Sequence, residues 1–178
     1  TGLVMGSFWA LTHIDIVLVR HFYPEKAGIY SLGQLTGLVI LFLPSAIPLI
    51  VFPKAAAARA RNSASLTYLK KGLLIVALIC AAGMLVCWLF PASVLSILAG
   101  KTVPESVQLV PWFSLAMSFF SMTMLILFYH LAVHNIRIVY PMMFLAIAET
   151  ATIYLYHPDL QTILYILIAY SIITFAVS

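Results

Sequence analysis

This chain contains six runs of about 20 mostly apolar residues, which are separated by short polar segments. A helix needs about 20 apolar residues to cross the hydrocarbon core of a bilayer, so each run is long enough to span it. No run alternates as a barrel strand does. We therefore predict an all-α polytopic membrane protein with transmembrane helices at residues 2–20, 28–52, 72–90, 107–133, 139–156 and 160–178.

The composition supports a membrane protein over a soluble one. Hydrophobic residues make up 64% of the chain and charged residues 8%, whereas soluble domains are roughly half apolar and a quarter charged. The basic residues flank the apolar runs, which argues against nucleic-acid binding. The chain does not begin with Met, and both ends lie in apolar helical sequence. We expect residues 1–178 to be a single six-helix lobe of a longer protein.

The distribution of basic residues predicts the orientation. The segment from Lys54 to Lys71 carries five basic residues and no acid, so by the positive-inside rule it is cytoplasmic. Pro53 predicts the start of a short basic helix at residues 54–61, next to the membrane. Residues 91–99 are too few to cross and predict an interfacial helix on the external side. With six spans the cytoplasmic side holds six basic residues, namely Lys54, Arg59, Arg61, Lys70, Lys71 and Arg137, against Arg20, Lys26 and Lys101 outside.

Small residues and prolines predict how two of the helices pack. Gly33 and Gly37, with Pro44 and Pro48 further along, fall on one side of the second span. This pattern predicts a helix that approaches a neighbour closely and then bends. In the first span, Gly6, Ala10 and His13 form a mostly small face, which we also expect to pack closely on another helix.

Two acids, Asp15 and Glu149, lie inside predicted spans. A charge near the bilayer centre costs on the order of 3 kcal/mol on insertion scales, so such an acid is more often retained for a function than by chance. Acids that exchange a proton or a cation are what a coupled transporter needs, and we expect Asp15 to face an aqueous passage. The alternatives are a structural hydrogen bond for Asp15, and a histidine or a partner subunit beside Glu149.

Other polar residues could line the same pathway. Ser31, Gln34 and Ser45 share one side of the second span, where they either line water or bond across helices. Arg20 is placed at the external membrane edge, where it either belongs to the pathway or anchors the helix by snorkelling. On the cytoplasmic side, Lys54, Arg59, Arg61 and Arg137 are candidates to hold an anionic lipid headgroup or a pyrophosphate, although topology alone would also place basic residues there.

The sequence offers no sign of catalysis or of a bound cofactor. The histidines have no metal-ligand arrangement, since His130 and His134 lack the intervening glutamate of an H-E-x-x-H motif. There is no glycine-rich phosphate loop after a strand and no G-x-S-x-G motif. We predict no enzyme activity, no metal and no cofactor.

Several segments resemble bacterial polysaccharide and O-antigen flippases, which belong to the multidrug/oligosaccharidyl-lipid/polysaccharide exporter superfamily. The resemblance rests on the run DIVLVRHFYPEKAGIYS from Asp15 to Ser31, on VFP at residues 51–53, on PASVLSILAG at 91–100 and on YHLA at 129–132. It covers about residues 10–135, in order, and is similar to the start of the second half of these proteins.

The resemblance implies a multi-pass protein of the bacterial inner membrane with two pseudo-symmetric lobes, of which this chain is the second. Such proteins flip lipid-linked oligosaccharides by alternating access. The acid on the first helix of the lobe then corresponds to Asp15, and Arg20 corresponds to a basic cavity residue that meets the substrate's phosphate, with Lys54 a further candidate. The implied partners are the lipid-linked glycan, membrane lipids and the missing N-terminal lobe.

Two other functions remain open at this stage. A drug or small-cation antiporter would share the fold and use Asp15 and Glu149 as its binding pair. An intramembrane sugar or acyl transferase would need a large extramembrane loop or a catalytic His/Asp pair, and the longest connection here is the basic segment from Lys54 to Lys71.

Overall fold

A computed structural model of the chain describes residues 2–60, 66–134 and 136–178, and within these ranges it contains helices and no strand. The prediction of an all-α fold is confirmed. The helices are α1 (Gly2–Phe22), α2 (Ala27–Phe42), α3 (Ala46–Ala60), α4 (Leu66–Leu89), α5 (Pro91–Ala99), α6 (Pro104–Ala132), the 3-10 helix η1 (Ile136–Ile138), α7 (Val139–Leu155) and α8 (Leu160–Val177).

The helices have the length and surface of membrane spans. Among the described residues, five segments are long and apolar enough to cross, namely Gly2–Phe22, Ala27–Ala60, Leu66–Leu89, Pro104–Ala132 and Leu160–Val177. With 17 residues α7 is a shorter apolar helix, at the lower limit for a span. Large apolar side chains cover the outside of the bundle; Ile97 and Leu155, for example, are 81% and 80% exposed. Such a surface is stable in lipid, and the chain is a multi-pass membrane protein.

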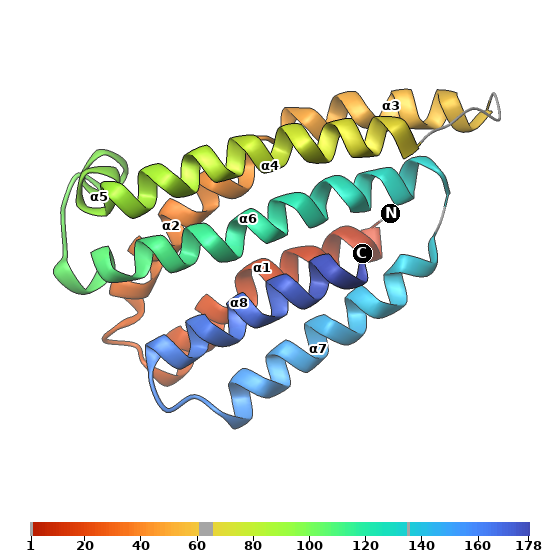
Figure 1. The fold of residues 1–178 in the computed structure, drawn as a ribbon. Coiled ribbons are helices and arrows are strands. Elements are labelled where there is room, and N and C mark those ends of the chain that lie inside the picture. Colours follow the sequence, from red (N-terminus) through yellow and green to blue (C-terminus); the bar gives the residue numbers. More distant parts are fainter. Residues whose placement is uncertain (1, 61–65, 135) are drawn as a thin grey trace.

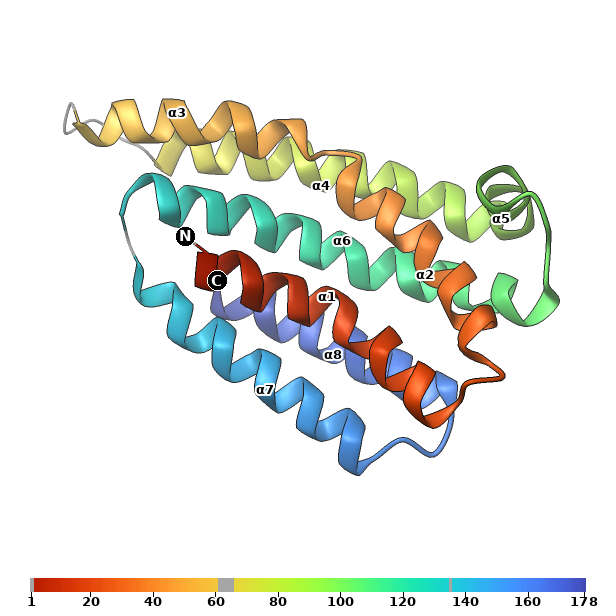
Figure 2. The same cartoon turned by 180° about the vertical axis from the view of Figure 1, so that it is seen from behind.

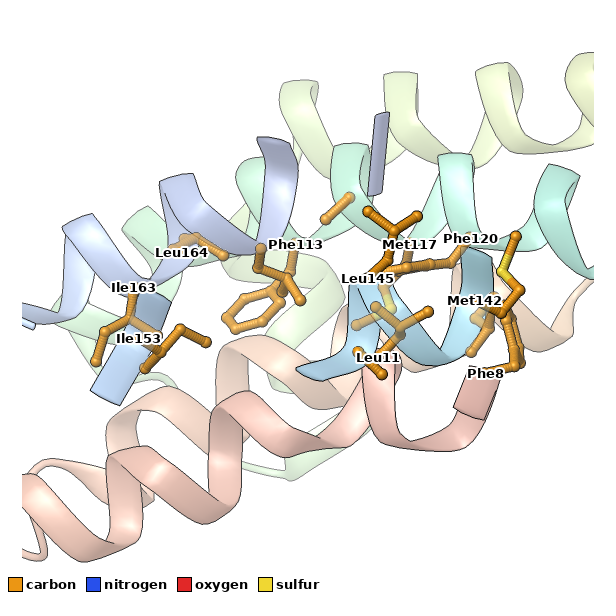
Figure 3. Packing of buried hydrophobic residues seen from close by; sticks show 14 of the residues in the cluster. Phe8, Leu11, Phe113, Met117, Phe120, Met142, Leu145, Ile153, Ile163 and Leu164 are labelled. Atoms are coloured by element: carbon orange, nitrogen blue, oxygen red, sulfur yellow. The ribbon is translucent and has the colours of Figure 1, made fainter. Parts of the chain in front are cut away.

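The centre of the bundle is α6, which lies between α4 on one side and α1 and α8 on the other (Figure 1). Of the most apolar 18 residues of α6, 61% are buried, compared with 22% for the corresponding stretch of α4. Phe113, Met117 and Phe120 of α6 meet Phe8 of α1 and Met142 of α7 in the main apolar cluster (Figure 3). Burial of this kind places α6 at the contact between the two sides of the bundle.

Glycine allows α2 to lie directly on α6 (Figure 2). A Cβ atom at Gly33 would be 2.9 Å from the Cβ of Leu109, and one at Gly37 would be 2.8 Å from Cγ of Met117. Contacts this short leave no room for a side chain. The predicted close approach is confirmed, and the neighbouring helix is α6.

The bend predicted in the second span is a complete break. α2 ends at Phe42 and α3 begins at Ala46. Pro44 accounts for the interruption, because proline lacks a backbone N–H and its ring clashes with the preceding helical turn. Pro48 is tolerated since it lies in the first turn of α3.

Pro53 does not begin a separate helix, and this prediction is wrong. It lies inside α3, which continues to Ala60 and therefore contains most of the basic helix predicted at residues 54–61. Ala55 and Ala58 are buried and belong to a small cluster with Tyr129 and Ala132 at the end of α6. Packing against α6 keeps this alanine-rich stretch in line with the helix before it, while Pro53 itself faces outward.

The short helix α5 matches the predicted interfacial segment at residues 91–99. Pro91 lies at its start, and Gly100, with a φ of 68°, ends it in the left-handed conformation that glycine adopts readily. The next helix begins earlier than predicted: α6 starts at Pro104 instead of Val107, because proline is well suited to a first helical turn.

Both ends of the described chain lie at one end of the bundle, where α3 ends and α4 begins (Figure 1). The opposite end carries α5 and the turns before α2, α6 and α8. An even number of crossings returns a chain to the side where it began, so the arrangement agrees with the predicted path. Which side is cytoplasmic stays a prediction.

Candidate functional site

A buried carboxyl group of α1 is held by two polar side chains of α2. The hydroxyl of Tyr30 donates a hydrogen bond of 2.9 Å to Oδ2 of Asp15. Nε2 of Gln34 donates to Oδ1 of Asp15 at 3.1 Å, and it also lies 3.4 Å from the carbonyl oxygen of Thr12. Asp15 and Tyr30 have no exposed surface, and Gln34 is 4% exposed. The three side chains form a hydrogen-bonded group that is closed to solvent.

Helical spacing explains how α2 supplies both donors. Tyr30 and Gln34 are four residues apart, so they lie one above the other on a single face of α2. The next glycines on that helix, Gly33 and Gly37, hold α2 against α6. Tyr30 also packs edge-to-face on Phe113 of α6, with 4.9 Å between ring centroids. The hydroxyl group of Tyr30 is thus fixed by its own helix and by α6.

A second buried acid, Glu149, comes from α7 and is fully buried as well. Its carboxyl group interacts electrostatically with that of Asp15. Neither oxygen of Glu149 has a hydrogen-bond partner among the residues that the structure describes. An unpaired buried carboxylate is costly in a medium of low dielectric constant, so Glu149 is the group in this site that a proton or a cation would stabilise most.

The pair can neutralise its charge in two ways. Two buried carboxylates that interact electrostatically repel each other, and a shared proton or a bound cation removes that repulsion. A hard cation takes oxygen ligands, which both carboxyl groups can supply. Among the described residues no group of three His, Cys, Asp or Glu side chains is placed to hold a metal ion. A proton shared by the two carboxyl groups and a monovalent cation bound between them would each neutralise the pair.

The structure brings together three of the four predicted pathway residues and leaves out the fourth. Asp15, Gln34 and Glu149 share the site, whereas Arg20 is exposed near the end of α1. Asp15 lies in a seam between helices without exposed surface, and the prediction that it faces an aqueous passage is wrong for this conformation. Gln34 forms hydrogen bonds across helices, which was the alternative to lining water. Ser31 is exposed and donates a hydrogen bond to Gly28 of its own helix.

The basic residues predicted to hold an anionic headgroup are exposed. Lys54 and Arg59 lie on the outer part of α3, and Arg137 lies in η1. Arg61 falls outside the described residues. Lys54 and Arg59 are on α3, whose C-terminal end lies at the end of the bundle that holds the α3–α4 connection (Figure 1). Exposure there is compatible with binding a headgroup and equally with topology alone.

The small-residue face of α1 does not pack closely on another helix, contrary to the prediction. A Cβ atom at Gly6 would meet nothing within 4 Å. This face instead lines an open apolar groove between α1 and α7, with cavities of about 310 and 520 Å³ that share Ala10, Ala146 and Ile147. Thr150, the neighbour of Glu149, lines the larger cavity. The groove therefore lies along the contact between α1 and α7, and one of its lining residues is the chain neighbour of Glu149.

Sequence reasoning missed Tyr30. A signal was present in its spacing from Gln34, since two polar side chains at i and i+4 in an apolar span point to one partner. The spacing alone is a weak signal, because tyrosines are common at the ends of spans, where they anchor helices at the membrane surface.

Comparison with known proteins found no family model, no curated protein and no solved structure that matches this chain.

Proposed function

We propose that this chain is one lobe of a transporter driven by a proton or a monovalent cation, and that its cargo is a lipid-linked oligosaccharide of the bacterial inner membrane. The observation that carries the coupling is the unpartnered carboxyl group of Glu149 beside Asp15. The cargo is inferred from the resemblance of several segments to polysaccharide flippases.

The acid pair would couple ion binding to the separation of helices. Asp15 comes from α1 and Glu149 from α7, while Tyr30 and Gln34 keep Asp15 bound to α2. With a proton or cation present the two carboxyl groups tolerate one another, and α1 and α7 stay together. Loss of that ion leaves two like charges in a dry seam, which favours opening of the seam along the apolar groove. Alternation between these arrangements is the type of motion that alternating access requires.

The exposed basic residues would contribute to recognition of the cargo. A lipid-linked glycan carries its anionic phosphate at the membrane surface, and each Lys or Arg near such a surface contributes about 1 kcal/mol. Lys54 and Arg59 are exposed on α3 at one end of the bundle, where they can attract this phosphate before the glycan moves.

Neutral variants of the two acids test the proposal. We expect Asp15→Asn and Glu149→Gln each to abolish transport of a fluorescent lipid-linked oligosaccharide in proteoliposomes, while both variants still insert into the membrane. Glu25→Gln is the matched control, because Glu25 is exposed in the turn before α2, and it should transport at the wild-type rate. Wild-type transport by either neutral variant would remove the pair from the mechanism.

A small-cation antiporter is the second candidate, and a feature of the same site favours it. Hydrogen bonds act on Asp15 and the carboxyl group of Asp15 acts on Glu149, and no basic side chain is among the described groups that act on either acid. A pair of this kind suits a cationic cargo. Binding of an organic cation such as ethidium, with loss of that binding in Glu149→Gln and no glycan transport by the wild type, would favour the antiporter over the flippase.

A further inference from the structure

A small crevice opens between the first turns of α6 and α8. Both helices begin at the end of the bundle away from the α3–α4 connection (Figure 1). Each helix contributes a glutamine and an aromatic residue four positions later, which places the two on one face. The cavity has a volume of about 130 Å³ and is lined by Gln108, Leu109, Trp112, Gln161, Leu164 and Tyr165. One glutamine and one aromatic side chain from α6, and one of each from α8, thus line the crevice.

The aromatic rings form an open corner. The rings of Trp112 and Tyr165 have centroids 5.8 Å apart and planes at 89°. Trp88 of α4 lies beside Trp112, with 5.9 Å between centroids. Trp112 is 37% exposed, Tyr165 is 51% exposed and Trp88 is 49% exposed. Ring surface therefore remains available to a ligand at this corner.

The two amides are also available. The chain has three glutamines, and Gln34 is engaged with Asp15 in the buried site. Gln108 and Gln161 are exposed, and within the described residues neither side chain has a hydrogen-bond partner. A primary amide offers both donors and an acceptor, so this pair can bind neighbouring hydroxyl groups that each donate and accept.

The geometry points to a site for one sugar ring in this crevice. A pyranose has C–H faces that pack on aromatic rings and hydroxyl groups at its rim that bind amides, and the crevice presents both kinds of partner. Drug-sized ligands occupy pockets of about 300–1,000 Å³, so a cavity of about 130 Å³ suits a single ring. The site rests on the proposed function: it would hold a sugar of the glycan at the predicted external end of the lobe.

A different role for the rings must be separated from this one. Tryptophan and tyrosine also gather at membrane surfaces, where they anchor helices without binding any ligand. Tyr156, at the end of α7, provides the comparison because it is 63% exposed at the same end of the bundle and does not line the crevice. If the rings only anchor helices, changing Tyr156 and changing Tyr165 should have equal effects on sugar binding. If the crevice binds a sugar, the change at Tyr165 should weaken binding and the change at Tyr156 should not.

Saturation-transfer NMR with the complete protein in nanodiscs tests the site. The probes are methyl α-glucoside and methyl N-acetyl-α-glucosaminide. We expect saturation transfer from the protein to the ring C–H protons of at least one probe. The Gln108→Leu/Gln161→Leu double variant should bind that probe more weakly by roughly tenfold or more, because it loses two hydrogen bonds. Tyr165→Leu should also lose the signal, and Tyr156→Leu should keep it.

The outcomes distinguish this inference from the proposed function. If the wild type gives no transfer with either probe, or if the double variant binds as the wild type does, the sugar site is wrong even where transport depends on Asp15 and Glu149. Equal losses in Tyr156→Leu and Tyr165→Leu would assign the rings to anchoring and would overturn the site. Sugar binding that needs both glutamines, in a protein that moves no glycan, would support the site and contradict the proposed function.

Discussion

The two buried acids differ in how they are held, although both are removed from solvent. Asp15 accepts hydrogen bonds from Tyr30 and Gln34, and Glu149 accepts none from the described residues. Donors of this kind compensate part of the cost of burying a charge. Glu149 is therefore the member of the pair whose charge is least supported by the protein, and Asp15 acts as the fixed partner.

At the start of α8, Asp159 lies outside the spans and ties the turn to its helix. Oδ1 of Asp159 accepts a 2.7 Å hydrogen bond from the backbone N–H of Thr162. Hydrogen bonds from the side chain and the backbone of Thr162 hold the pKa of Asp159 below its ordinary value of 3.8. A carboxyl group with a lowered folded-state pKa stabilises the fold above its unfolded pKa, and the contribution is lost as the pH falls through the folded pKa.

We predict that Asp159→Asn removes this part of the acid dependence and keeps most of the cap, because asparagine caps helices about as well as aspartate. Asp159→Ala should lose the cap at neutral pH as well. Thermal unfolding of the wild type and the two variants, followed from about pH 6 to pH 3, checks both statements. Parallel curves for the wild type and Asp159→Asn below the ordinary pKa would show that the cap contributes nothing to the acid dependence.

At the residue scale the sequence predicted the members of the site better than their surroundings. An acid within an apolar span is visible in the sequence, so Asp15 and Glu149 could be selected. Only the antiporter alternative paired them, and helical spacing could not establish that they interact, because this depends on how α1 and α7 are placed side by side. Whether a polar side chain faces water or another helix was also open for Gln34, since helical spacing gives a face and not the neighbour of that face.

At the scale of helices, the contact between α2 and α6 is the most restrictive one described. Gly37 lies with Phe113 and Met117 against it, so that an added Cβ atom would be 3.1 Å from the carbonyl oxygen of Phe113. Backbone cannot move aside as a flexible side chain can. Gly83 differs in this respect, because its close neighbour is the terminal Cδ1 of Ile40.

We predict that Gly37→Ala lowers the free energy of unfolding by about 1–3 kcal/mol, the usual cost of an overpacked contact. Gly6→Ala should be neutral or slightly stabilising, because its Cβ atom meets nothing within 4 Å and alanine favours a helix by about 0.5–1 kcal/mol over glycine. Thermal unfolding in bicelles compares the two variants. Equal stability of Gly37→Ala and Gly6→Ala would mean that α2 and α6 are not in close contact.

The prolines show why helix ends were predicted unevenly. Pro44 interrupts the helix where only a bend was predicted, while Pro53 does not interrupt it. Both lack the same N–H group, and the difference lies in the packing around them. Buried Ala55 and Ala58 hold the chain beyond Pro53 against α6. A contact of that kind involves residues some 70 positions away along the chain, roughly the separation of Ala58 and Tyr129, and local sequence does not reveal it.

For the whole molecule, the orientation in the membrane is the prediction with the widest consequences. We predict that Lys70 is cytoplasmic and that Pro158 is external. Each position is exposed and can be changed to cysteine in a variant whose buried Cys80 and Cys87 are replaced by alanine. A membrane-impermeant thiol reagent added to intact cells should label Pro158→Cys and leave Lys70→Cys unlabelled.

The opposite labelling pattern would show that the protein is inserted in the membrane in the opposite orientation. The basic residues on α3 would then be outside, where they could not collect a substrate made in the cytoplasm, and the crevice between α6 and α8 would open to the cytoplasm. The positions of the spans themselves were largely predictable from apolar length. The orientation followed from basic residues alone, which is why it needs a separate measurement.

The central position of α6 also affects how the protein is made. Ribosomes deliver α1, α2, α3 and α4 to the membrane before residues 104–132 have been synthesised. Until then Gly33 and Gly37 have no helix to lie on, and the donors around Asp15 lack the ring of Phe113 behind Tyr30. The early helices are therefore in the membrane before α6, against which α2 packs. The acid site can be completed only after α7 has also been inserted.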